Sequence, residues 1–344
     1  TTTTSLLHLL LDLRALSNFI MVTPPNTNAN TYSTPQAGAV SDSKLDSKSL
    51  VDEIFHQLSD DEKEQTARAS SYRYLVASSS PATEHDKRDH YAKAMIERYI
   101  TVEQKLEKHK SPDVWVATAT LKLRKTLKYR KEKQVDDMLL CFHKDNIGNG
   151  DDELHAAIRD GLTNRFSNKA SIVRGYTKDG RAMFQNIART EFHWEKEYYI
   201  KGNIYMMERA IACTERNTDG EKDKVVVFYD YNGYGMKNTP PVMLCNELLS
   251  DLRDHWPERI EHVFLVDAPL AFRVFWKIIK HFVDPITKQL VQFVTGEEEK
   301  KKIFGEMISE DQAAPYMHDG GLNGKEADMK TFFYDTPFDH AYGE

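Results

Sequence analysis

Two short runs of large apolar residues constrain the fold of this chain most strongly. VVVFYD at 225–230 and HVFLVDA at 262–268 are each almost continuously apolar, which is typical of strands buried on both faces of a parallel sheet. The stretch at 241–256 between them has helical spacing, and KQLVQFVT at 288–295 indicates a third strand. An order of strand, helix, strand, helix, strand needs crossover connections, so the sequence predicts an α/β fold with a parallel or mixed sheet.

The part of the chain before these strands has a different character. Residues 1–49 include a Pro-, Asn-, Ser- and Thr-rich stretch with few large apolar side chains, so we expect this segment to be disordered. Residues 50–150 are predicted to form a helical subdomain, because apolar residues recur at helical spacing within 111–145. SIVRGYTKDGRAMFQNIA, at 171–188, then predicts two short strands around a KDG turn.

Composition narrows the classes of partner and compartment. The net charge of -7 and the pI near 6.0 argue against a nucleic-acid-binding protein, which normally carries a basic surface. The three cysteines form no CxxC pair, which favours a reducing, cytoplasmic compartment. The leucine cluster near the start of the chain lacks a basic flank and is interrupted by charges, so we do not expect a signal peptide.

Several motifs then carry a resemblance. WPERIEHVFLVDAP at 256–269, followed by FVDPIT at 282–287, closely resembles the CRAL-TRIO lipid-binding family, and in particular its phosphatidylinositol-transfer branch. Other landmarks of that family follow in order: GYTKDGRA at 175–182, DxxG at 230–233 and PYMHDGG at 315–321. The basic stretch at 121–139 resembles the helical subdomain that family members place upstream.

The resemblance implies a particular fold. It is a twisted, mostly parallel sheet that floors an apolar pocket, closed by a helical gate and preceded by a small all-helical subdomain. On this basis we assign residues 165–325 to the lipid-binding domain and residues 326–344 to a C-terminal tail. The gate is the apolar segment 270–282. A fully buried core helix would have the same composition, so that alternative stays open from the residues alone.

The residues expected to line the pocket and the gate are large and apolar. They are Phe184, Val225, Val227, Phe272, Phe275, Trp276 and Ile279. Relatives that also carry phosphatidylcholine have hydroxyl residues at the positions of the first three. Because the hydroxyl donors are missing here, the resemblance implies phosphatidylinositol in preference to phosphatidylcholine.

The same resemblance names residues for the lipid headgroup. It places Glu258 and Thr287 against the inositol and phosphate, with Arg130 and Lys131 as a basic pair on the phosphate. Lys288 lies close to a position where relatives carry a lysine. Each residue also has an ordinary structural interpretation, because Glu258 suits a surface ion pair, Thr287 suits a cap, and the lysine and arginine suit a solvated helix face.

The sequence therefore predicts a phospholipid-binding and transfer protein that meets membrane surfaces transiently, acts as a monomer and needs neither a metal nor a cofactor. Alternatives are a regulatory module of the same fold that senses lipid or binds a protein, or a carrier of a sterol, a tocopherol-like molecule or haem. An enzyme using His255, Glu258 and Asp267 is least favoured, because no nucleophile or metal-binding set accompanies them.

Overall fold

The computed structural model describes residues 47–77, 87–147, 152–190, 195–235, 238, 240–270, 289–318 and 326–343. Residues 1–46 of the segment 1–49 that we expect to be disordered, and residues 271–282 of the expected gate 270–282, lie outside these residues, as do residues 283–288.

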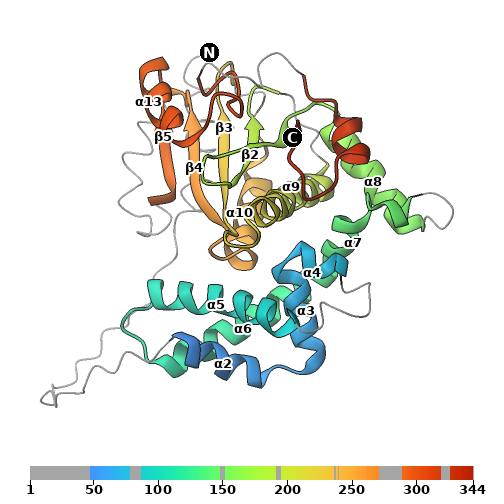
Figure 1. Ribbon diagram of the computed structural model, residues 1–344, viewed down its shortest axis with the longest axis vertical. Helices are drawn as coiled ribbons and strands as arrows, with labels where there is room; N and C mark the ends of the chain where they lie inside the picture. Colours follow the sequence, from blue (N-terminus) through green and yellow to red (C-terminus); the bar gives the residue numbers. More distant parts are fainter. Residues whose placement is uncertain are drawn as a thin grey trace, which may run out of the picture.

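The amino-terminal half is helical. Its elements are α2 (Ser47–Gln57), α3 (Asp60–Ser70), α4 (Tyr72–Ala77), α5 (Arg88–Leu106), α6 (Pro112–Glu132), α7 (Val135–Leu140) and a 3₁₀ turn (Lys144–Asn146). Local sequence explains where these helices start: Ser59 and Glu62 form a reciprocal capping box at α3, and Pro112 opens α6. Helices α2, α3, α5 and α6 share one apolar core and form the lower part of the molecule in Figure 1.

The second half contains the sheet. Its elements are α8 (Glu153–Phe166), β1 (Ser171–Tyr176), β2 (Ala182–Ile187), α9 (Lys196–Asn217), β3 (Val225–Asp230), α10 (Val242–His255), β4 (Ile260–Val266), β5 (Val291–Val294), α13 (Glu297–Met307) and a π-helical turn (Thr331–Asp335). The strands lie in the order β1-β2-β3-β4-β5. Strands β2 to β5 run parallel, whereas β1 pairs with β2 in the antiparallel direction across the KDG turn. The predicted α/β fold with a mostly parallel sheet is therefore confirmed.

Both faces of the sheet are covered. Val225 and Val227 point into the core that includes α9, whereas Val226 and Phe228 belong to a second core with Phe304 of α13. This alternation follows from the two-residue period of a strand, and it explains why VVVFYD has apolar residues at nearly every position. Helix α9 is buried along almost its whole length because it packs against the sheet, α7, α8 and α10.

One irregularity marks the start of β4. Val225 of β3 pairs with Ile260 of β4, and Val226 pairs with His262, so Glu261 is an extra residue on β4 and forms a β-bulge. An extra residue of this kind re-aims a side chain and locally bends the strand. Here Glu261 turns toward Arg181 and Lys224, which lie at the amino ends of β2 and β3.

Candidate functional site

The WPER segment connects α10 to β4 and joins the two halves of the molecule. Trp256 is buried and its indole Nε1 donates a hydrogen bond to the Glu208 carboxylate on α9 at 3.1 Å. Arg259 is also buried, and it donates to the main-chain oxygens of Ser70 and Asp223. Pro257 and Glu258 therefore lie between two residues that are each held by buried contacts to separate elements.

Glu258 lies between these two anchors in an unusual backbone conformation. Its φ of +57° is in the left-handed region, which costs about 1–2 kcal/mol for a residue other than glycine. Its carboxylate is only 12% exposed and accepts hydrogen bonds from Lys105 Nζ at 2.7 Å and Lys224 Nζ at 3.2 Å. Burial acts to raise the pKa of this carboxyl, but the hydrogen bonds and charges of Lys105 and Lys224 outweigh it and lower the pKa. Glu258 is therefore an ionised hydrogen-bond acceptor.

Arg130 and Lys131 occupy different environments although they are adjacent on α6. The Arg130 guanidinium is buried and forms ion pairs with the carboxylates of Glu208 and, at 3.1 Å, Asp136. Lys131 is exposed. The structure thus brings Arg130 close to Trp256 through their common acceptor Glu208, while Lys131 points to another side of the helix.

A small cleft lies between the two halves beside the WPER segment. It is lined by Ala69, Met95, Arg98, Arg130, Glu208, His255, Trp256, Pro257 and Arg259. His255 stacks on Tyr129 with ring centroids 4.0 Å apart, and its Nδ1 is 2.7 Å from the Thr126 hydroxyl. Burial lowers the pKa of His255 to about 4, so its ring is neutral at physiological pH.

The three residues of the enzyme alternative do not converge. Glu258 precedes β4 and Asp267 follows it, so they lie at opposite ends of a seven-residue strand, on the order of 20 Å apart. Asp267 pairs with Lys300 at 2.7 Å, and His255 contacts Thr126. Within the described ranges no group of three or more His, Cys, Asp or Glu side chains is arranged to hold a metal ion.

The predicted pocket residues on the sheet are buried. Phe184, Val225 and Val227 are at most 4% exposed and pack in the core that includes α9. Their role in lipid contact stays a prediction. The remaining predicted residues, namely Phe272, Phe275, Trp276, Ile279, Thr287 and Lys288, lie outside the described residues.

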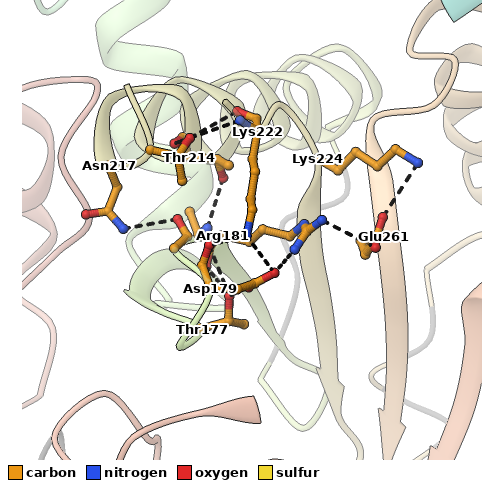
Figure 2. A network of polar contacts seen from close by, with 11 residues as sticks. Thr177, Asp179, Arg181, Thr214, Asn217, Lys222, Lys224 and Glu261 are labelled. Atoms are coloured by element: carbon orange, nitrogen blue, oxygen red, sulfur yellow. Dashed lines mark hydrogen bonds and ion pairs between the residues drawn. The ribbon is translucent and has the colours of Figure 1, made fainter. Parts of the chain in front are cut away.

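The amino ends of the parallel strands carry a chain of ion pairs, most of which is drawn in Figure 2. Asp179 of the KDG turn pairs with Arg181 and, at 3.0 Å, with Lys222. Arg181 reaches Glu261 at 3.4 Å, and Glu261 contacts Lys224 at 3.5 Å. Since Lys224 also contacts Glu258, the GYTKDGRA turn and the WPER segment are linked by alternating charges.

Comparison with known proteins identifies the sheet-containing half. Residues 166–315 match the family model described as the CRAL/TRIO domain. This part of the chain is a CRAL/TRIO domain. The predicted family is thereby confirmed, and the WPER segment, the GYTKDGRA turn and all five strands lie within the match.

Curated relatives of the chain include lipid-transfer proteins. It is 29% identical over 118 residues to the phosphatidylinositol transfer protein PDR17 of Saccharomyces cerevisiae, covering 33% of this chain and 30% of that protein. It is 23% identical over 272 residues to the phosphatidylinositol/phosphatidylcholine transfer protein SFH7 of Arabidopsis thaliana, covering 76% of this chain and 48% of the relative. The chain thus spans less than half the length of either protein. Among solved structures, that of Sfh5 matches with a TM-score of 0.44 at 15% identity, covering 71% of this chain and 80% of the other.

The CRAL/TRIO domain supplies only part of the candidate site. Glu258 and Lys224 lie inside the domain, whereas Lys105 and Arg130 come from the upstream helices. Sequence reasoning missed Lys105, Lys224 and the buried acid Glu208. Lys224 had a usable signal, because it precedes β3 as Glu258 precedes β4, and parallel neighbouring strands begin at the same edge of a sheet. Lys105 is 153 positions from Glu258 and had no such signal.

Proposed function

We propose that this protein binds a phospholipid, with phosphatidylinositol preferred, and transfers or presents it between membranes. The observation that carries the proposal is the CRAL/TRIO domain itself, together with relatives named as phosphatidylinositol transfer proteins. Two acyl chains hold on the order of 30 methylene groups, whose exposure to water would cost on the order of 25 kcal/mol. A carrier must therefore replace the bilayer with protein, which is the task expected of an apolar pocket.

The headgroup preference rests on the chemistry of Glu258. An ionised carboxylate accepts hydrogen bonds from hydroxyl groups, which the inositol ring has in abundance and choline does not. The positions of Phe184, Val225 and Val227 supply no hydroxyl that would donate to a choline phosphate. We therefore expect phosphatidylinositol to move between vesicles faster than phosphatidylcholine. The assay is transfer of fluorescent lipids between donor and acceptor vesicles, and equal or faster phosphatidylcholine transfer would reject this preference.

The proposal includes transient membrane contact by a protein of the cytoplasm. Among the described residues, none of the helices combines the length and apolar character needed to cross a bilayer. Native mass spectrometry of the purified protein tests the broader function. A stoichiometric phospholipid supports it, whereas a protein that takes up no phospholipid from vesicles favours a regulatory module, and a bound sterol or haem indicates a different cargo.

Replacing Glu258 with glutamine is expected to reduce phosphatidylinositol retention about 10- to 100-fold, because a hydrogen bond to a charged group contributes about 1.5–3 kcal/mol. The measurement is the fraction of protein carrying the lipid after incubation with vesicles. Glu261→Gln provides a matched control, since Glu261 also contacts Lys224 but points toward Arg181. If both variants retain phosphatidylinositol like the wild type, Glu258 is a structural residue and not a headgroup contact.

A further inference from the structure

Two ammonium groups meet one oxygen of the Glu258 carboxylate. Lys105 Nζ and Lys224 Nζ both donate to Oε2, at 2.7 Å and 3.2 Å. A carboxylate has two acceptor oxygens, so this arrangement commits Oε2 to the protein and presents Oε1 to other donors. The lysine side chains are 43% and 30% exposed, compared with 12% for the glutamate. They therefore reach the carboxylate from the solvent side.

The two lysines come from different parts of the molecule. Lys105 lies in the last turn of α5, and Lys224 immediately precedes β3 of the CRAL/TRIO domain. Because Arg259 and Trp256 fix the main chain on both sides of Glu258, the carboxylate cannot leave the lysines without a side-chain rearrangement. The position of the acceptor thus depends on the upstream helices as well as on the domain.

The charges around Glu258 reverse its electrostatic preference. Seven residues form the connected chain of ion pairs: Lys105, Glu258, Lys224, Glu261, Arg181, Asp179 and Lys222. Four are cations and three are anions, which leaves one net positive charge. A lone glutamate would attract a cationic headgroup such as choline or ethanolamine, whereas this group favours an anionic phosphate that carries a neutral polyol.

We propose that Lys105 and Lys224 are specificity-determining residues, which orient the Glu258 carboxylate for inositol hydroxyls and disfavour cationic headgroups. The inference rests on the proposed lipid function and adds to it a cause of selectivity. It also gives the helical half of the chain a role in headgroup choice, because Lys105 lies outside the matched domain.

The experiment is competition between lipids for the full chain. Wild type and the double variant Lys105→Met, Lys224→Met are incubated with vesicles containing equal amounts of phosphatidylinositol, phosphatidylcholine and phosphatidylethanolamine, and the bound lipids are counted by native mass spectrometry. We expect the ratio of phosphatidylinositol to the two zwitterionic lipids to fall at least tenfold in the double variant. Lys125→Met is the matched control, since Lys125 also forms a lysine–carboxylate pair, with Asp254 at 3.1 Å, and should leave the ratio unchanged.

Two further measurements separate orientation from simple structural support. Lys105→Arg with Lys224→Arg keeps both charges and should restore most of the wild-type ratio, provided that circular dichroism shows all variants folded.

The second measurement is the pH dependence of binding. Lys105 and Lys224 hold the pKa of the Glu258 carboxyl down against the effect of burial. Glu261 is the other acidic residue that contacts Lys224. Phosphatidylinositol binding should therefore fail at a higher pH in the methionine variant than in the wild type as the solution is acidified.

The outcomes distinguish this inference from the function on which it rests. A wild type that binds phosphatidylinositol selectively, beside a double methionine variant with the same ratio and the same pH profile, overturns the role of the lysines and leaves the lipid function standing. A wild type that takes up no phosphatidylinositol from the vesicles overturns both.

Discussion

Replacing Arg130 with methionine is expected to destabilise the protein by about 3–5 kcal/mol, because it leaves a buried carboxylate without its cation. Arg130 pairs with Glu208, and the two side chains are only 8% and 9% exposed. It also pairs with Asp136 at 3.1 Å. The Arg130–Glu208 pair joins α6 of the helical half to α9, which packs against the sheet. Loss of this pair should therefore weaken the association of the two halves.

Lys131→Met is the matched control for this prediction. Lys131 is the next residue on the same helix but is exposed, so the change should cost less than about 0.5 kcal/mol. Urea denaturation followed by circular dichroism measures both free energies of unfolding. Adding Glu208→Met to Arg130→Met should recover part of the loss, because it removes the unpaired charge. Equal, small effects at Arg130 and Lys131 would show that the buried ion pair contributes little.

The same pair of variants bears on the predicted headgroup role of these residues. If Lys131 contacts phosphate, Lys131→Met should weaken lipid binding without lowering stability. Arg130 is committed to two carboxylates in the structure, so weaker lipid binding by Arg130→Met has meaning only under conditions where that variant is folded.

The sheet could be predicted from the sequence because its signals are local. VVVFYD and HVFLVDA are short apolar runs bounded by polar residues, and the KDG turn between β1 and β2 fits the observed antiparallel pair. The nearly complete burial of α9, by contrast, depends on the sheet and on α7, α8 and α10 packing around it, which no local pattern encodes.

The candidate site was less predictable because its contacts join distant residues. The motif WPER singled out Glu258, yet the partners of that carboxylate come from α5 and from the residue before β3. Likewise, the basic stretch on α6 did not single out Arg130 as buried and Lys131 as exposed, since the two cations are adjacent within KYRKEK at 128–133. Which cation on a helix meets a buried acid depends on tertiary packing.

The C-terminal segment shows the same limitation. The sequence analysis assigned residues 326–344 to a C-terminal tail. Residues 326–343 instead pack against α8, α9 and β1, and Figure 1 shows this part beside α8. Arg209 of α9 is fully buried and donates to the main-chain oxygens of Thr336 at 3.1 Å and Pro337 at 3.0 Å. Tyr342 N donates to Val173 O on β1, the first strand of the sheet. Such contacts involve main-chain groups, so side-chain periodicity does not reveal them.

Phe333→Ala in this segment is expected to destabilise the protein by about 3–5 kcal/mol, the usual cost of removing a buried aromatic ring. Phe333 is 1% exposed, and its ring centroid lies 4.9 Å from that of Phe142 and 5.6 Å from that of Tyr205. It therefore fills the junction between the turn after α7 and helix α9, and the cavity left by alanine would separate elements from both halves of the chain.

The neighbouring aromatic residue supplies the control for Phe333→Ala. Tyr334 is 38% exposed and makes an edge contact with Phe142 at 5.1 Å, so Tyr334→Ala should cost about 1 kcal/mol or less. Denaturant unfolding of the two variants gives the comparison directly. A Phe333→Ala protein as stable as Tyr334→Ala would mean that residues 326–343 rest on the surface without contributing to the core. A large difference instead makes this segment, which follows the matched CRAL/TRIO region, part of the cooperative folding unit.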